Sequence, residues 1–69
     1  MLTFEELKQI LNENSIVGLY DANHNILGFY DGFNDIDEEF DDCYVEDIFS
    51  DMWGKVPAIG VEISYLPFD

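Results

Sequence analysis

The chain has 69 residues, of which 16 are Asp or Glu and only 2 are Lys or Arg, giving a formal net charge of −14 at pH 7. A chain this short buries only about 60% of the surface that its unfolded form exposes, so we expect one small core and one domain, residues 1–69. Because 48% of its residues are hydrophobic and 16% are aromatic, the composition excludes an intrinsically disordered chain, which would combine high charge with low hydrophobicity.

The charge also restricts the partners. Binding to nucleic acid or to an anionic membrane normally requires several basic side chains, and this chain offers Lys8 and Lys55. No stretch approaches the roughly 20 apolar residues of a membrane span, and the first residues lack the pattern of a signal peptide. The one cysteine, Cys43, cannot form an internal disulfide. We therefore expect a cytoplasmic protein that contacts neither nucleic acid nor membrane directly and whose partner is basic.

The first element is a helix. In LTFEELKQILNEN, Thr3 followed by Glu6 forms a capping box, and Leu2 is placed to pack against Leu7. Apolar residues continue at helical spacing. The pattern predicts a helix over residues 3–13 that ends with Asn14 in the left-handed conformation.

A β-hairpin follows over residues 15–32. The stretches SIVGLY and ILGFYD are rich in strand-forming residues and flank DANHN, whose Asp and Asn side chains favour a turn. Gly18 and Gly28 lie inside these strands and indicate a bulge or a close approach of another backbone segment.

The acidic stretch after the hairpin allows two interpretations. Apolar residues of 40–53 fall on opposite sides of a helical wheel, which argues against one long helix. Divided near Asp42, the stretch gives a short helix over residues 35–42 with Asp35 or Asp37 as N-cap, then a strand over 43–53. In that strand Cys43, Val45, Phe49 and Trp53 would share one side.

The last element is a strand. In AIGVEISYL, four large side chains (Ile59, Val61, Ile63 and Tyr65) alternate with small or polar ones, and Gly54 and Pro57 bracket the preceding turn. The sequence therefore predicts an α+β fold of order α-β-β-(short α)-β-β, with the N-terminal helix packed on a small antiparallel sheet. The alternative order, α-β-β-α-β, has a helix over residues 37–52.

Sites for metals, cofactors and catalysis are not expected. DANHNILGFYDG begins like an EF-hand loop, but Ile26 replaces its sixth-position glycine and Gly32 its final glutamate. One cysteine and one histidine, Cys43 and His24, do not supply a zinc site. Paired acids such as Asp41 and Asp42 would catalyse only in a pocket that separates their pKa values, so we expect a non-enzymatic protein without cofactors.

The distinctive signal is the combination of acids and aromatic residues. Duplex DNA carries one negative charge per about 1.7 Å of axis, so carboxylates on a rigid surface can occupy a protein channel that binds phosphates. Exposed aromatic residues among Phe40, Tyr44, Phe49 and Trp53 would then supply the buried contacts that give affinity. The opposite interpretation makes the acids an ordinary solvated surface and the aromatic residues the core.

Three short motifs carry a resemblance. TFEEL at 3–7, VGLYDAN at 17–23 and VEI at 61–63 resemble pieces of short acidic proteins encoded by phages and mobile elements. That set is similar in size and charge to phage-encoded inhibitors of host defence, including anti-CRISPR proteins and other DNA mimics. The resemblance implies a target in the host cytoplasm, such as a Cas effector or a restriction nuclease. It assigns no role to a particular residue.

We therefore expect an acidic inhibitor that binds the basic nucleic-acid-binding site of a host protein; an immunity protein or antitoxin would use the same physics against another nuclease. The alternative is a structural or assembly protein that self-associates through a β-edge, for example as a homodimer, with the acids serving solubility. The candidate partner-binding residues are Asp35, Asp37, Glu38, Glu39, Asp41, Asp42, Glu46, Asp47 and Asp51.

Overall fold

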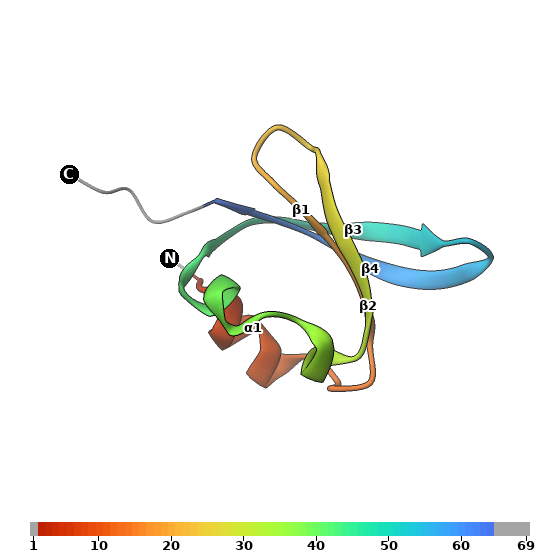
Figure 1. Cartoon of the computed structure of the whole chain (residues 1–69), viewed down its shortest axis with the longest axis horizontal. Coiled ribbons are helices and arrows are strands. Elements are labelled where there is room, and N and C mark those ends of the chain that lie inside the picture. The colour runs from red at the N-terminus through yellow and green to blue at the C-terminus, as the bar shows by residue number, and fades with distance from the viewer. Residues whose placement is uncertain (1, 65–69) are drawn as a thin grey trace.

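The computed structural model of the chain describes residues 2–64 (Figure 1). Its elements are α1 (Phe4–Ile10), β1 (Ile16–Tyr20), β2 (Ile26–Asp31), the 3-10 helices η1 (Phe33–Asp35) and η2 (Glu38–Asp42), β3 (Tyr44–Trp53) and β4 (Val56–Ser64). The α+β class and the order α-β-β-(short helix)-β-β are confirmed. The alternative with a helix over residues 37–52 is wrong, because β3 occupies most of that range.

The four strands form one mixed sheet in the order β2-β1-β4-β3. The outer pairs, β1–β2 and β3–β4, are antiparallel hairpins, whereas the central pair, β1–β4, is parallel. A parallel pair needs a long crossover connection, and the segment from β2 through η1, η2 and β3 supplies it. The expectation of a fully antiparallel sheet was therefore wrong for the central pair.

Helix α1 begins as expected and ends early. The Thr3 hydroxyl accepts a hydrogen bond from the Glu6 N–H at 3.2 Å, and the Thr3 N–H donates to Glu6 Oε1 at 2.9 Å, which completes the capping box. The helix stops at Ile10, with Leu11 already extended. The Asn14 N–H donates to the Asn12 side chain at 2.8 Å, a local turn that competes with further helix. Asn14 is not left-handed; among residues 2–64 the non-glycine residue with positive φ is His24.

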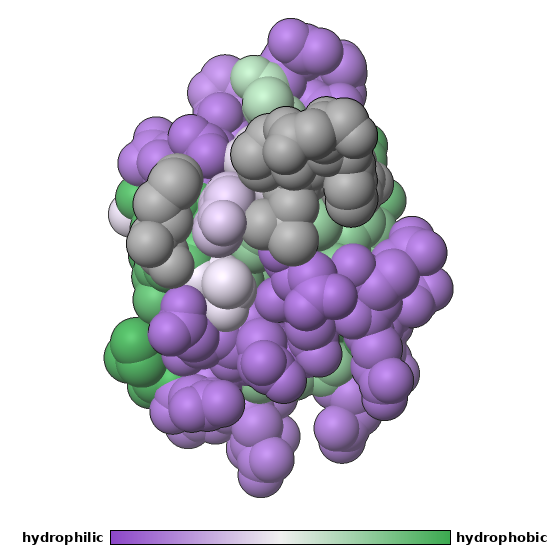
Figure 2. Space-filling model, turned by 90° about the vertical axis from the view of Figure 1, so that its left-hand side faces the viewer, coloured by the Kyte–Doolittle hydropathy of each residue, from purple (hydrophilic) through white to green (hydrophobic). Residues whose placement is uncertain are grey.

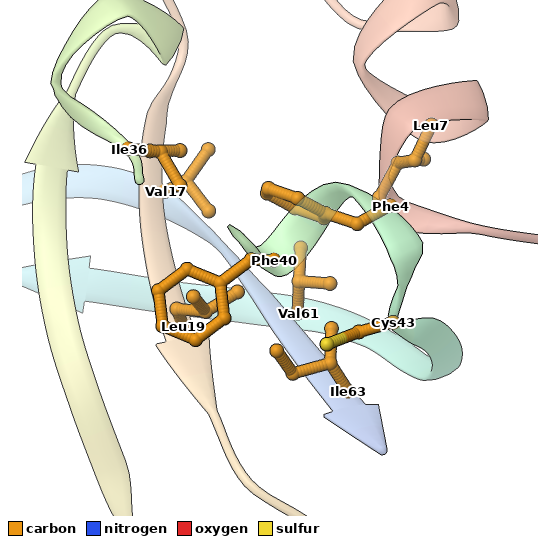
Figure 3. Close-up of a cluster of buried hydrophobic side chains, with 9 residues drawn as sticks. All are labelled: Phe4, Leu7, Val17, Leu19, Ile36, Phe40, Cys43, Val61 and Ile63. Atoms are coloured by element: carbon orange, nitrogen blue, oxygen red, sulfur yellow. The ribbon is translucent and has the colours of Figure 1, made fainter. Parts of the chain in front are cut away.

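The core lies between one face of the sheet and the layer formed by α1, η1 and η2 (Figure 3). Burial raises the pKa of the Cys43 thiol, with the charges of Asp42 and Glu39 adding to the effect. Cys43 is thus a buried apolar group of the core. The core residues are Phe4, Leu7, Val17, Leu19, Ile36, Phe40, Cys43, Val61 and Ile63.

A β-bulge divides β3 into two parts that face opposite ways. Val45 pairs with Ile63 on the core face, but the register shifts before Asp47, which pairs with Glu62 on the other face. The extra residue reverses the alternation, so Phe49 and Trp53 point away from the core. The expectation that they share a side with Val45 was wrong for this reason.

Candidate partner-binding surfaces

The nine acids expected to bind a partner lie in two parts of the fold. Six lie on or next to η1 and η2, in the layer that contains α1, and the other three lie on β3. They do not share one face. Figure 2 shows extensive hydrophilic surface on the side of the molecule that carries α1 and η2. We call the first group the acidic segment; its members are Asp35, Asp37, Glu38, Glu39, Asp41 and Asp42.

Two members of the acidic segment have structural roles. Asp37 is the N-cap of η2, as the sequence suggested, and its Oδ1 accepts from the Glu39 N–H at 3.0 Å. Asp41 pairs with Lys8 of α1, with 2.5 Å between Oδ1 and Nζ and about four fifths of each side chain buried. Lys8 also lies 5.6 Å from the centre of the Phe4 ring. This ion pair joins η2 to α1, so Asp41 is already engaged within the fold.

The second surface is the face of the sheet opposite the core, which we call the open face because no described element packs on it. Aromatic side chains gather there. The Phe29 and Trp53 rings are stacked with centres 5.7 Å apart, and the Tyr20 and Phe49 rings are 5.3 Å apart. His24 contacts Tyr20 and Phe49 edge-on, at 6.1 Å and 5.8 Å. We call these five residues the aromatic cluster.

Two glycines in the central strands make room for the cluster. One row across the sheet reads Phe29, Gly18, Gly60, Phe49, because these residues are register partners in β2, β1, β4 and β3. A Cβ on Gly60 would lie 2.2 Å from a carbon of the Phe49 ring, and one on Gly18 would lie 2.7 Å from the Phe29 ring. The rings of the outer strands therefore lie over the glycines. The groups that approach Gly18 are side chains, whereas the expectation from the sequence was a bulge or a backbone segment.

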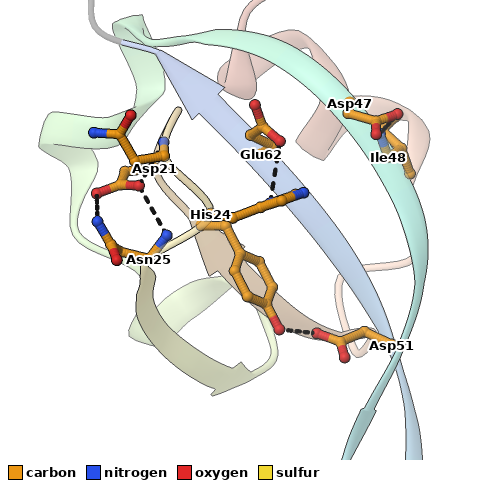
Figure 4. Close-up of polar contacts among 9 residues, drawn as sticks. Asp21, His24, Asn25, Asp47, Ile48, Asp51 and Glu62 are labelled. Atoms are coloured by element: carbon orange, nitrogen blue, oxygen red, sulfur yellow. Dashed lines mark hydrogen bonds and ion pairs between the residues drawn. The ribbon is translucent and has the colours of Figure 1, made fainter.

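Three carboxylates share the open face with the aromatic cluster; Figure 4 shows Glu62 next to His24, with Asp47 and Asp51 on β3. Asp51 Oδ2 accepts from the Tyr20 hydroxyl at 2.6 Å, and this hydrogen bond is the main reason why the pKa of Tyr20 is raised. Glu62 lies 3.3 Å from His24 Nδ1. Asp47 is the Glu62 partner in β3 and is exposed. Three acidic side chains thus lie on the open face with the five rings.

The same β3 carboxylates bind backbone groups of their own strand. Asp47 Oδ1 accepts from the Ile48 N–H at 2.9 Å, and Asp51 Oδ1 accepts from the Met52 N–H at 2.8 Å. Glu46, the bulged residue, instead accepts from the Ser64 hydroxyl at 2.7 Å. Two N–H groups of the β3 edge strand are therefore already occupied by side chains.

The open face differs from what the sequence suggested. Of the four aromatic residues proposed as anchors, Phe40 is in the core and Tyr44 is half-buried, while Phe49 and Trp53 join the cluster. The contributions of Tyr20, Phe29 and Glu62 were missed. The sequence feature that could have indicated this cluster is the glycine in the middle of each central strand, because a residue without a side chain leaves room for side chains of neighbouring strands.

The turn between β1 and β2 is held by Asp21. Its Oδ1 accepts from the Asn23 and Asn25 N–H groups at 2.8 and 2.9 Å, and these hydrogen bonds, that of Asn25 above all, lower the pKa of Asp21. DANHN is thus a turn, as expected. Within residues 2–64 no three His, Cys, Asp or Glu side chains converge as a metal site.

A small open pocket lies where β1 and β4 separate. Its volume is about 210 Å³, and its lining includes Ser15, Ile16 and Pro57. Pockets for small organic ligands usually have about 300–1,000 Å³ and convergent polar groups. This pocket does not indicate a substrate site.

Comparison of the chain with protein-family models, with curated proteins and with solved structures found no match. Among residues 2–64, no helix has the length and apolar character to cross a membrane. The two surfaces are therefore the basis for a functional argument.

Proposed function

We propose that the chain is a non-enzymatic inhibitor that occupies the basic nucleic-acid-binding site of a host defence protein, such as a CRISPR-Cas or restriction nuclease, as a DNA mimic. One observation carries this proposal: most Asp and Glu side chains of residues 2–64 are exposed, none is fully buried, and of these acids Lys8 and His24 contact only Asp41 and Glu62. The other carboxylates of this part have no basic side chain within ion-pair distance to balance their charge. A partner rich in Arg and Lys would supply the missing charge.

The placement of the acidic segment suits this role. Glu38, Glu39 and Asp42 are exposed on η2, which the Lys8–Asp41 ion pair and the buried Phe40 side chain hold against the rest of the fold. Asp35 is exposed on the neighbouring η1. Held charges of one sign raise the rate of association with an oppositely charged site by up to about 10³-fold, and salt weakens the effect. Binding should therefore be fast and strongly dependent on ionic strength.

The alternative, assembly through a β-edge, has one observation in its favour. Ile48 and Met52 of the β3 edge strand are 46% and 52% exposed, so an added strand would bury apolar surface. However, the N–H groups of both residues are bound by Asp47 and Asp51. A second copy paired there would also place like charges against each other, a device that natural sheets use to prevent pairing. These observations favour the inhibitor.

The test uses two variants of equal charge. Glu38→Lys/Glu39→Lys alters the acidic segment, and Glu13→Lys/Asp31→Lys makes the same change in net charge at exposed positions outside it. Each protein is immobilised, exposed to a cell lysate at low salt and eluted with duplex DNA. We expect one basic nucleic-acid enzyme on the unaltered protein and the control variant, and its loss from the first variant.

Circular dichroism must show that both variants are folded. Retention of many unrelated basic proteins, with no release by DNA, would overturn the proposal. Equal loss from both variants would show that net charge alone, and not the acidic segment, is responsible.

A further inference from the structure

We propose that the open face is a second contact surface, which binds arginine side chains of a basic partner through the aromatic cluster and its carboxylates. The inference rests on the proposed function for the existence of that partner. It adds a surface that is distinct from the acidic segment and that selects arginine over lysine.

The aromatic rings of the open face are held in place and remain accessible. The Phe29 and Phe49 rings lie over Gly18 and Gly60, and each ring of the cluster contacts at least one other ring. Trp53 is nevertheless 43% exposed, and His24 is exposed on the same face. A rigid aromatic surface loses little conformational entropy when a partner binds.

The open face also carries negative charge. Asp47, Asp51 and Glu62 lie on it, whereas Lys8 lies in the helical layer and Lys55 in the turn between β3 and β4. The Asp51 carboxylate accepts two hydrogen bonds within the fold, and two oxygens together offer about four acceptor sites. The face thus retains acceptors and negative charge for a cation.

These two properties together select the occupant. An apolar partner would remove water from the carboxylates without compensation, and a second copy of the chain would bring three more carboxylates against them. A guanidinium group satisfies both properties, because it stacks on aromatic rings and donates several hydrogen bonds to carboxylates. The ammonium group of lysine is a compact, strongly hydrated charge and stacks less well.

The test compares capped hexa-arginine and hexa-lysine peptides at low salt. Trp53 is the single tryptophan of the chain, so its fluorescence reports directly on the open face. We expect hexa-arginine to change this fluorescence and to bind roughly twofold to fivefold more tightly than hexa-lysine, the range of an exposed cation–π contact. Equal affinities for the two peptides would overturn the inference.

Three variants locate the preference by calorimetry. Trp53→Ala and Phe29→Leu should each reduce the preference for arginine, and the milder second variant serves if the first does not fold. Met52→Ala removes an exposed side chain from the other face of the same strand and should preserve the preference. A preference that survives both cluster substitutions in folded protein would also overturn the inference.

The outcomes separate this inference from the proposed function. Glu38→Lys/Glu39→Lys should lower the affinity for both peptides by the same factor and leave the preference for arginine unchanged. If capture of the natural partner depends on Glu38 and Glu39 but not on Trp53, the open face is not a contact surface and the proposed function stands. If the arginine preference holds but no nucleic-acid enzyme is captured, the proposed function fails instead. A dimer in sedimentation that Trp53→Ala abolishes would show that a second copy covers the face and would overturn the inference.

Discussion

Substitution of Gly60 by alanine tests the arrangement of the open face. The new methyl carbon would lie 2.2 Å from one carbon of the Phe49 ring and 2.6 Å from two others. Carbon atoms in contact are normally at least about 3.5 Å apart, so the ring must move by roughly 1.3 Å or more. Phe49 would then lose its packing on Tyr20 and His24. Overpacking of this kind costs about 1–3 kcal/mol, and replacing glycine within a strand returns about 0.5–1 kcal/mol.

We therefore expect Gly60→Ala to lower the free energy of unfolding by about 1 kcal/mol, which for a domain of this size lowers Tm by about 4–8 °C. Thermal unfolding followed by circular dichroism measures the effect. Its control is the double variant Gly60→Ala/Phe49→Ala, in which the ring is absent and the alanine should cost little beyond the loss of Phe49 itself. An unchanged or raised Tm in the single variant would refute the proposed contact between glycine and ring.

Three further predictions follow from the hydrogen bonds and the ion pair. Thr3→Ala removes the N-cap and should lower the free energy of unfolding by about 1 kcal/mol in chemical denaturation, whereas Thr3→Ser should not. Because the pKa of Tyr20 is raised, its hydrogen bond to Asp51 stabilises the fold below about pH 10, and this contribution is lost as pH rises through the raised pKa. In Asp51→Asn, ultraviolet titration should show the pKa of Tyr20 returning toward its ordinary value of 10.0. Lys8→Met leaves the Asp41 carboxylate half-buried without its partner and should destabilise the fold by roughly 1 kcal/mol, and adding Asp41→Asn should restore most of the loss.

The elements that sequence patterns predicted well are those determined by neighbouring residues. The capping box depends on two residues of one helical turn, and the β1–β2 turn depends on Asp21 and the residues just after it. Large side chains alternate with small or polar ones over residues 59–64, and this pattern predicted a strand correctly because only one face of the strand is buried in the core. The expected Tyr65 at its end lies outside the described residues.

The features that the sequence did not reveal depend on distant parts of the chain. The bulge at Glu46 is defined by the register of β3 against β4, and no local pattern marks it. The aromatic cluster depends on the parallel pairing of β1 with β4, which brings Gly18 beside Gly60. The sequence alone shows that acidic residues are abundant, but only the folded structure shows that they are divided between the helical layer and β3.

The parallel contact between β1 and β4 has a consequence for how the chain folds. Each hairpin forms from neighbouring segments, whereas this central contact joins strands from opposite ends of the described chain and must close a long loop first. Both halves carry acids, so their approach is opposed by repulsion that salt screens, with a Debye length of about 10 Å at 0.1 M. We expect the docking of the two hairpins to limit the rate of refolding, and added salt to accelerate refolding more than it slows unfolding in stopped-flow measurements. The pairing of β1 with β4 is then the last contact of the sheet to form.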